Sequence, residues 1–179
     1  MAIIAQINFD EIPHLKGYPK TGILQFFIAA HDDLLGWNED NFANPGNNVG
    51  YDVRYFPKVD RDLAKLETDF TFLPPTTDYG EVFLPIEDEA RLTFQNRTEF
   101  INPDDYRFTR IFGEDFYDKL GPFKVSVWNW LYDRPSSNQH KIGGWGNFAQ
   151  TDPRYQVEHE DWSLLFQMDS DVEANIYWG

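Results

Sequence analysis

The sequence contains no cysteine among its 179 residues. This absence excludes disulfide bonds, thiolate zinc sites and a cysteine nucleophile, and it is typical of a protein in a reducing compartment. Basic residues are also few, since 15 Lys and Arg stand against 30 Asp and Glu and give a formal net charge of -15. Because each phosphate contact needs a cation, this balance disfavours a nucleic-acid partner. An acidic surface of this kind is typical of a solvated, soluble protein, and the alternative is that its field attracts a basic protein partner.

Long hydrophobic runs are absent as well. The opening segment MAIIAQINFDE has no basic region and only a short apolar stretch, so it does not resemble an export signal. No later run approaches the roughly 20 apolar residues needed to cross a bilayer. We therefore predict a cytoplasmic protein that does not insert into a membrane.

Apolar side chains are present in the amount that a folded protein needs. They make up 41% of the residues, and aromatic side chains alone make up 17%. This content is far from the aromatic-poor composition of disordered chains. The length also fits an ordinary domain of roughly 100–200 residues. We therefore predict one folded domain over residues 1–179.

The apolar segments are short and rich in Ile, Val, Phe, Tyr and Trp, and 11 prolines and 12 glycines interrupt the chain. Such segments favour strands over long helices. We predict an α+β fold that is sheet-rich and mainly antiparallel, with a few short helices. The predicted strands are Ala2–Ile7, Gly22–Ala29, Tyr51–Phe56, Ala90–Gln95, Phe123–Trp130 and Ser163–Asp169. The predicted helices are Lys58–Thr68 and Asn102–Leu120, of which Gly113 weakens the second.

The aromatic segment Val125–Tyr132 alternates in part, as a strand does. A strand would place Trp128, Trp130 and Tyr132 on one face. Large rings on one face predict a buried core. If that face is exposed, it predicts an interaction surface, because Trp and Tyr are common at interface hot spots.

Two segments near opposite ends of the chain share one pattern. Residues 3–10, IIAQINFD, align with residues 164–171, LLFQMDSD, as three apolar residues, Gln, one apolar residue, Asn or Asp, any residue, and Asp. The match predicts an internal duplication in which each half contributes a strand. If these strands pair around a pseudo-twofold axis, Gln6 and Gln167 lie near each other. The simplest role for each is a buried Gln that satisfies backbone groups.

These residues, together with the segment HKIGGWGNFAQTDPR at 140–154, resemble the YwqG-like family of uncharacterised, mostly bacterial proteins. The matching segments are, in chain order, IIAQINFDEIP, GILQFFI, HKIGGWGNFAQTDPR, SLLFQMDSD and IYWG. The resemblance implies a sheet-rich α+β fold with an internal duplication and no established reaction. It also implies a single domain shortened at both ends, whose exposed sheet edges a partner copy covers in a homodimer. Some members of the family are suspected of being immunity factors beside secreted toxins.

The segment 140–154 contains three glycines. Gly144-x-Gly146-x-x-Ala149 resembles a dinucleotide fingerprint, but no strand precedes it and Pro153 follows too soon for the required helix. We therefore predict no cofactor here, and glycines that permit tight backbone bends between sheet segments. The alternative is a loop that binds a ligand or partner. Its candidate residues are His140, Gly143, Gly144, Gln150 and Asp152, with Gln6 and Gln167 nearby.

Catalytic and metal-binding patterns are missing. The four histidines lack the spacing of a zinc site, and Asp169-x-Asp171-x-Glu173 lacks the glycine and the length of a calcium loop, so we predict no metal. No serine lies in a Gly-x-Ser-x-Gly elbow. The first hypothesis is therefore a non-enzymatic acidic domain that binds a protein partner, in the manner of a toxin-immunity protein. The alternative is a small-molecule-binding or hydrolytic enzyme with its site between the duplicated halves.

Overall fold

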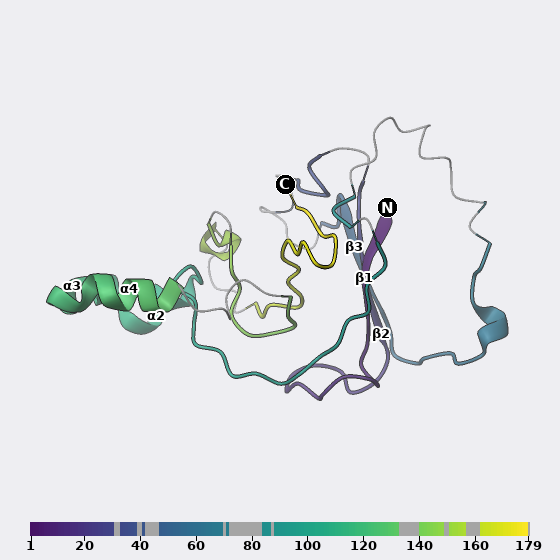
Figure 1. Cartoon of the computed structure of the whole chain (residues 1–179), viewed down its shortest axis with the longest axis horizontal. Helices are drawn as coiled ribbons and strands as arrows, with labels where there is room; N and C mark the ends of the chain where they lie inside the picture. Colours follow the sequence, from purple (N-terminus) through teal and green to yellow (C-terminus); the bar gives the residue numbers. More distant parts are fainter. Residues whose placement is uncertain are drawn as a thin grey trace. The chain divides into compact units, whose positions relative to one another are not determined.

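The computed structural model describes residues 1–30, 33–38, 41, 47–69, 71, 84–86, 88–132, 140–148, 151–156 and 162–178. The chain divides into two compact units. Unit 1 comprises Met1–Asn96 and Asp171–Gly179, and unit 2 comprises Arg97–Ser170. Figure 1 shows a sheet in unit 1 and short helices in unit 2, so the chain has an α+β fold.

The sheet of unit 1 has three antiparallel strands in the order β1-β2-β3. These strands are β1 (Ala2–Asn8), β2 (Ile23–Ile28) and β3 (Tyr51–Phe56). All three positions confirm the strands predicted from short apolar segments rich in β-branched and aromatic residues. The connection between β1 and β2 includes Gly17 and Gly22, whose φ angles of 92° and 99° suit glycine alone.

One face of this sheet forms the core of unit 1. In β2, Leu24, Phe26 and Ile28 are buried and alternate with half-buried residues. On the same face of β1, Ile7 lies opposite Leu24 and is only 1% exposed. The period of two residues therefore separates a buried face from a more exposed one.

The C-terminal segment of unit 1 is a tight turn. Asp171 and Ile176 form an isolated bridge, and Ile176 also bridges Ile86. The Asp171 carboxylate accepts the backbone N–H groups of Glu173 and Ala174 at 2.9 Å and 3.2 Å. Asp171, the middle acidic residue of the segment that resembles a calcium loop in sequence, therefore caps a turn here.

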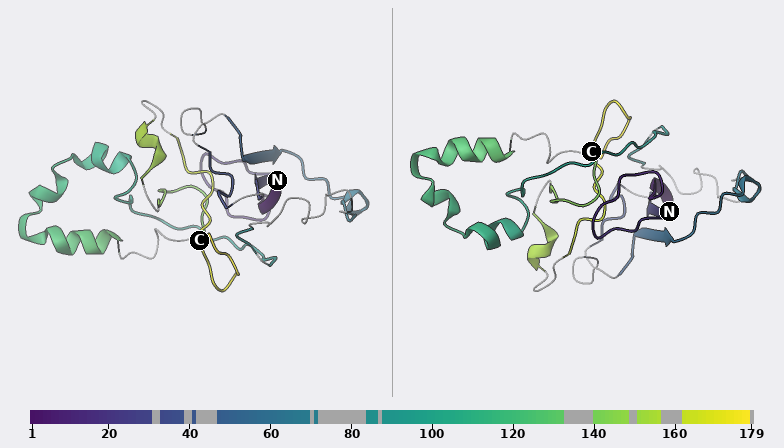
Figure 2. Two further views of the ribbon diagram at one scale, coloured as in Figure 1. Left: turned by 90° about the horizontal axis from the view of Figure 1, so that it is seen from above. Right: turned by 90° about the horizontal axis from the view of Figure 1, so that it is seen from below.

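The described residues of unit 2 contain three short α-helices, which follow one another around an open arc (Figure 2). They are α2 (Arg107–Phe112), α3 (Phe116–Lys119) and α4 (Lys124–Tyr132). Two 3-10 helices, η3 (Gly121–Phe123) and η4 (Pro153–Gln156), also belong to this unit. The predicted helix Asn102–Leu120 is thus split, and Gly113 ends α2 with a φ of 87°.

The prediction of a strand at Phe123–Trp130 is wrong, because most of this segment is α4. Pro122 lies in the first turn of η3, where proline is favoured, and η3 runs directly into α4. Trp128 and Tyr132 are four residues apart and their ring centroids lie 4.5 Å apart. The predicted strand face that joined Trp128, Trp130 and Tyr132 therefore does not exist.

Three other predicted elements also differ from the structure. Ala90–Gln95 contains no strand, and Ser163–Asp169 contributes one isolated bridge, from Gln167 to Lys141. Within Lys58–Thr68, only η1 (Leu63–Lys65) is helical, capped by the Asp62 carboxylate. A strand needs a neighbour of matching length, and the local pattern of a sequence does not supply one.

The two segments with a shared sequence pattern have different local structures. Residues 3–10 include most of β1, whereas residues 164–171 form no strand. Residues 3–10 belong to unit 1, whereas residues 164–170 of the second segment belong to unit 2. The internal duplication stays a prediction, and so does the placement of Gln6 near Gln167.

Candidate functional site

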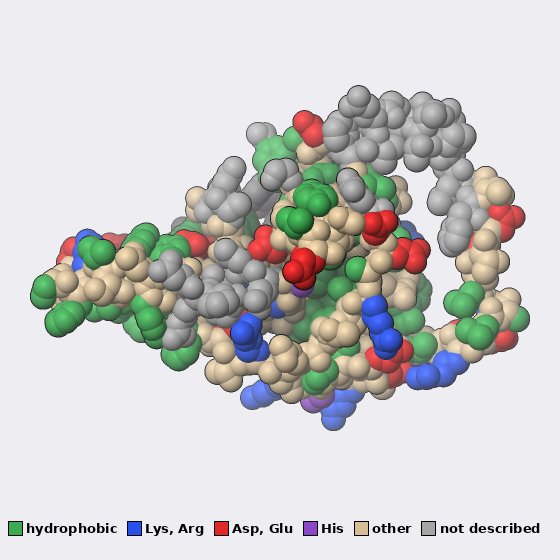
Figure 3. Space-filling view, viewed as in Figure 1, with side chains coloured by type: hydrophobic (Ala, Val, Ile, Leu, Met, Phe, Trp, Pro, Cys, Tyr) green, Lys and Arg blue, Asp and Glu red, His purple; other side chains and the backbone are tan. Residues whose placement is uncertain are grey.

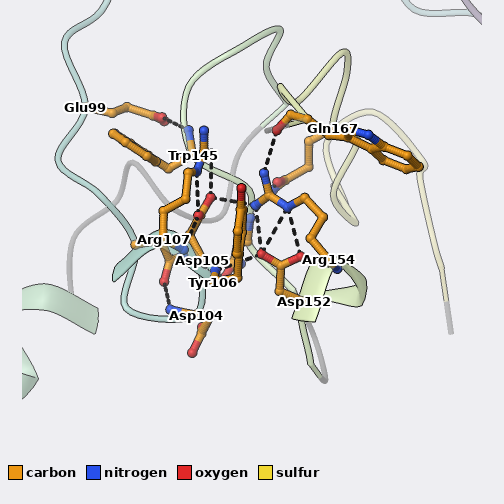
Figure 4. Close-up of polar contacts among 12 residues, drawn as sticks. Glu99, Asp104, Asp105, Tyr106, Arg107, Trp145, Asp152, Arg154 and Gln167 are labelled. Atoms are coloured by element: carbon orange, nitrogen blue, oxygen red, sulfur yellow. Dashed lines mark hydrogen bonds and ion pairs between the residues drawn. The ribbon is translucent and has the colours of Figure 1, made fainter. Parts of the chain in front are cut away.

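Four charged side chains of unit 2 form a largely buried cluster (Figure 4). Asp105 and Asp152 are 0% and 1% exposed, and Arg154 is 8% exposed. Nη2 of Arg154 lies 2.7 Å from Oδ2 of Asp105 and 2.7 Å from Oδ2 of Asp152. Nη2 of Arg107 lies 2.8 Å from Oδ2 of Asp105. The Arg154 guanidinium therefore bridges two buried carboxylates that are far apart in the sequence.

The same local motif builds both halves of this cluster. In Asp105-Tyr106-Arg107 and Asp152-Pro153-Arg154, the Asp carboxylate accepts the backbone N–H two residues later, at 3.0 Å and 2.9 Å. It also accepts the Nε–H of the same arginine, at 2.8 Å and 3.0 Å. Each motif is an Asx turn that its own arginine closes. The first turn leads into α2, and the second leads into η4.

Hydrogen bonds to the backbone tie three segments of unit 2 to this cluster. The Asp152 carboxylate accepts the N–H of Tyr106 at 2.9 Å. Nη1 of Arg154 donates to the carbonyl oxygen of Trp162 at 2.8 Å. The cluster therefore fastens the start of α2, the start of η4 and the segment at Trp162 to one another.

Aromatic rings cover both guanidinium groups. The Arg107 Cζ lies 4.5 Å from the centroid of the Trp145 ring. The Arg154 Cζ lies 4.7 Å from the Tyr106 ring and 5.7 Å from the Phe148 ring. Rings in these positions attract a cation and exclude water, which strengthens the ion pairs beneath them.

The electrostatics keep this cluster charged. Burial acts to raise the pKa of Asp105, but hydrogen bonds from Arg107 and Arg154 outweigh burial and lower it below its ordinary value. Burial likewise acts to lower the pKa of Arg154, but hydrogen bonds with Asp152 and Asp105 outweigh it and raise this pKa. Asp105 is therefore a carboxylate at neutral pH, whereas a general acid needs a raised pKa.

We expect acid to weaken unit 2 through Asp105. Because the pKa of Asp105 is lower in the folded chain, this residue stabilises the fold above its unfolded pKa of about 3.9 and loses that contribution as the pH falls through its lowered value. Urea unfolding between pH 7 and pH 2 measures the effect. Asp105→Asn should be less stable at neutral pH and should take up fewer protons on unfolding, by up to about one proton. Equal proton uptake by both proteins would contradict this assignment.

The glycine-rich loop at 140–148 is bent around a carboxylate of the chain itself. Oε2 of Glu99 accepts the N–H of Trp145 at 3.1 Å, and Oε1 lies 2.9 Å from Nζ of Lys141. Gly143 and Gly144 have φ angles of 69° and 75°. A Cβ at Gly144 would collide with Oε2 of Glu99. This glycine therefore allows both the bend and the approach of the carboxylate.

The far side of this loop is fastened to the segment 162–170. Lys141 and Gln167 exchange two backbone hydrogen bonds, of 2.9 Å and 2.8 Å. Oε1 of Gln167 accepts the N–H of Asn147 at 2.9 Å. Nδ1 of His140 accepts the N–H of Asp169 at 3.2 Å. These side chains thus satisfy backbone groups, and Gln167 does so from a half-buried position where a buried one was predicted.

The sequence-predicted site residues that the structure describes are divided between the two units. His140, Gly143, Gly144, Asp152 and Gln167 lie in unit 2, and all of them except Gly144 make local hydrogen bonds through a side chain or the backbone. In unit 1, Gln6 is exposed and accepts a hydrogen bond from Nε2 of Gln25 at 2.6 Å, so the prediction of a buried Gln6 is wrong. Gln150 lies outside the described residues.

Sequence reasoning missed the residues that hold this region together, which are Glu99, Asp105, Arg107 and Arg154. The repeated spacing Asp-x-Arg is the signal that could have identified the two turns. It occurs a third time in Asp52-Val53-Arg54, where Nε of Arg54 lies 2.7 Å from Oδ2 of Asp52. In that pair on β3, the side chain of Arg54 is exposed and that of Asp52 is half-buried, so the spacing predicts the ion pair but not its burial.

Two further features, a metal-binding cluster and a membrane-spanning helix, are not found among the residues that the structure describes. No group of three or more His, Asp or Glu side chains in the described ranges could hold a metal ion. No helix in the same ranges is long and apolar enough to span a membrane.

A comparison with protein families gives a match over the whole chain. The model of a family described as "Domain of unknown function (DUF1963)" matches residues 1–179. No curated protein matches the chain.

Proposed function

The chain belongs to the DUF1963 family, whose function is unknown, and we propose that it is a non-enzymatic, acidic domain that binds a protein partner. Within that family we assign it to the YwqG-like proteins, on the segments quoted from its sequence. Its partner is a basic protein, and a toxin that it neutralises is the partner class that the resemblance favours. The observation that carries the proposal is the exposure of α4.

α4 is apolar around most of its circumference and yet has no buried residue. Phe123, which directly precedes α4, and Val125, in its first turn, are 66% and 69% exposed. Trp128 and Trp130 are 44% and 50% exposed. A helix that is apolar on all sides is ordinarily buried, so a partner that covers α4 accounts for this composition. Figure 3 shows hydrophobic side chains on the surface of the helical region.

The exposed rings of α4 are nevertheless held in place. Trp128 packs against Tyr117 and Tyr132, with ring centroids 4.9 Å and 4.5 Å away. Trp130 meets Phe100 edge to face at 5.8 Å. Ordered, half-exposed tryptophans lose little conformational entropy on binding, which is a property of interface hot spots.

The charge of the chain supports a basic partner. The formal net charge is -15, and long-range attraction at this charge accelerates association with a cationic protein. Salt screens this attraction, but it does not screen apolar contacts with tryptophan rings that become buried in an interface. The two contributions can therefore be measured separately.

The double substitution Trp128→Ala and Trp130→Ala is expected to abolish most of the partner binding. Truncation of one hot-spot residue costs about 2 kcal/mol or more, which corresponds to about a 30-fold loss of affinity. The partner is captured from a lysate of the source organism on the immobilised chain, purified, and titrated at low and high salt. We expect salt to slow association with the wild-type chain, and the double variant to increase dissociation.

A matched control uses Leu63→Ala, because Leu63 is 77% exposed but lies in η1 of unit 1. This variant should bind as the wild type does. Circular dichroism should show that both variants are folded, since the substituted side chains are not buried. A purified partner that binds the double variant normally, or that is indifferent to salt, would argue against the proposal.

The enzyme hypothesis has no specific observation in its favour. Two residues predicted for such a site already have partners. The Asp152 carboxylate forms an ion pair with Arg154 and accepts the N–H of Tyr106, and Nδ1 of His140 accepts the N–H of Asp169. It stays the alternative hypothesis.

A further inference from the structure

Asp104 lies next to the buried ion-pair cluster but takes no part in its ion pairs (Figure 4). Asp105 and Asp152 are each paired with an arginine, whereas no Lys, Arg or His among the described residues lies within ion-pair distance of Asp104. The cluster itself holds two carboxylates and two guanidinium groups, so its net charge is zero and it leaves the charge of Asp104 uncompensated. A half-buried carboxylate without a counter-ion attracts a cation from outside the chain.

The hydroxyl of Tyr132 holds this carboxylate in place. It donates to Oδ1 of Asp104 at 2.9 Å, and among the described residues no group donates to Oδ2. Tyr132 is the last residue of α4, and its ring packs on Trp128 with centroids 4.5 Å apart. Burial and the hydrogen bond to Asp104 raise the pKa of Tyr132, so its hydroxyl keeps its proton. An open carboxylate oxygen is thus held near the half-exposed Trp128.

Tyr117 brings a second hydroxyl to the same region. Its ring also packs on Trp128, with centroids 4.9 Å apart. Its hydroxyl oxygen is closed to solvent and has no hydrogen-bond partner among the described residues. Burial raises the pKa of Tyr117, and the negative charge of Asp104 raises it further, so the two groups are close together. A buried hydroxyl without a partner destabilises the fold, and a ligand that donates to it would remove this cost.

The groups that a ligand meets here are acceptors of hydrogen bonds. They are Oδ2 of Asp104 and the hydroxyl oxygens of Tyr117 and Tyr132. A lysine ammonium has three N–H donors and no acceptor, so it matches three oxygens. An arginine guanidinium binds a carboxylate best through both oxygens, but Oδ1 of Asp104 already accepts the Tyr132 hydroxyl. The ring of Trp128 adds attraction for a cation.

We propose that Asp104, Tyr117 and Tyr132 bind the ammonium group of a lysine side chain of the partner, whose methylene chain lies along Trp128. The ammonium reaches the Tyr117 hydroxyl after a small shift of the rings, for which Trp128, 44% exposed, has room. The inference rests on the proposed function, because it names the group that a basic partner inserts beside α4. It adds a specific contact to the long-range attraction between the two proteins.

A tetralysine peptide with blocked ends tests the inference on the full chain. It is titrated at low salt while the indole N–H signal of Trp128 is followed by NMR. A peptide whose four side chains are trimethylated keeps the charge but has no ammonium donors, so it should bind at least about fivefold more weakly. Asp104→Asn keeps an acceptor for Tyr132 and should weaken tetralysine binding at least about fivefold. Glu114→Gln removes an exposed carboxylate of the same unit and should change it less than about twofold.

Tyr117→Phe supplies a readout that a purely structural role would not move. Removal of the unpaired hydroxyl should leave the free energy of unfolding unchanged or raise it, and should weaken tetralysine binding by about threefold or more. The inference is overturned if tetralysine does not shift the Trp128 signal, or if the trimethylated peptide binds equally well. Unchanged binding by Asp104→Asn or Tyr117→Phe would also overturn it. These results leave the proposed function intact, because the Trp128→Ala and Trp130→Ala variant tests that function separately.

Discussion

Replacing Arg154 by methionine is expected to lower the free energy of unfolding of unit 2 by about 3–5 kcal/mol, because removal of one partner from a buried ion pair leaves an uncompensated charge. The change leaves Asp105 and Asp152, 0% and 1% exposed, without the guanidinium that lies between them. It also removes a donor to the carbonyl of Trp162. Urea unfolding followed by circular dichroism and by tryptophan fluorescence measures the loss.

The matched control is Arg54→Met, because Arg54 occupies the same position of an Asp-x-Arg motif. Its side chain is 56% exposed, so its ion pair with Asp52 should contribute less than about 1 kcal/mol. If Arg154→Met and Arg54→Met lower the free energy of unfolding by the same amount, the burial of the cluster does not contribute to its stabilising effect. Adding Asp105→Asn and Asp152→Asn to Arg154→Met should recover part of the stability, since the buried charges are then removed together.

The strands of the unit 1 sheet could be predicted from the sequence because the features that indicate each strand lie within the strand and the turns beside it. The segments around Ile7, Phe26 and Val53 are short, apolar and β-branched or aromatic, and turn residues separate the first two strands. These features are enough to place three strands. The prediction at Ala90–Gln95 failed because a strand also requires a neighbouring strand, which local composition does not encode.

Unit 2 was harder to predict for a physical reason. The segment KVSVWNWLY alternates in part and is apolar on most sides, so its pattern fits a strand and a helix equally well. The Gly-Pro pair that begins η3 decides in favour of the helix. Periodicity alone therefore could not assign the segment that now carries the proposed function.

The candidate site was predictable only in part. The interpretation of the glycines as bends is consistent with positive φ angles at Gly143 and Gly144. Glu99, whose carboxylate accepts the N–H of Trp145 in that bend, lies 46 positions away from Trp145 in the sequence. Asp105 and Arg154 are separated by 49 positions. Contacts of this range depend on the tertiary fold, so one sequence gives the motifs but not their pairing.

Gly144→Ala is expected to destabilise unit 2 by about 3 kcal/mol or more, through two effects that act at one atom. An L-residue at φ 75° is strained by about 1–2 kcal/mol. The added Cβ also collides with the Glu99 carboxylate, which must then leave Lys141 and the N–H of Trp145. Loss of these charge-assisted hydrogen bonds accounts for the remainder.

Gly17→Ala separates the two effects, because Gly17 has a φ of 92° and no atom within 4 Å of the position that a Cβ would occupy. Gly17→Ala should therefore lower the free energy of unfolding only by the cost of the backbone strain. In a Glu99→Ala background the carboxylate is absent, so Gly144→Ala should there cost about as much as Gly17→Ala. Urea unfolding of the four proteins of this cycle measures the coupling between Gly144 and Glu99. A coupling near zero would mean that the loop does not depend on the carboxylate around which it bends.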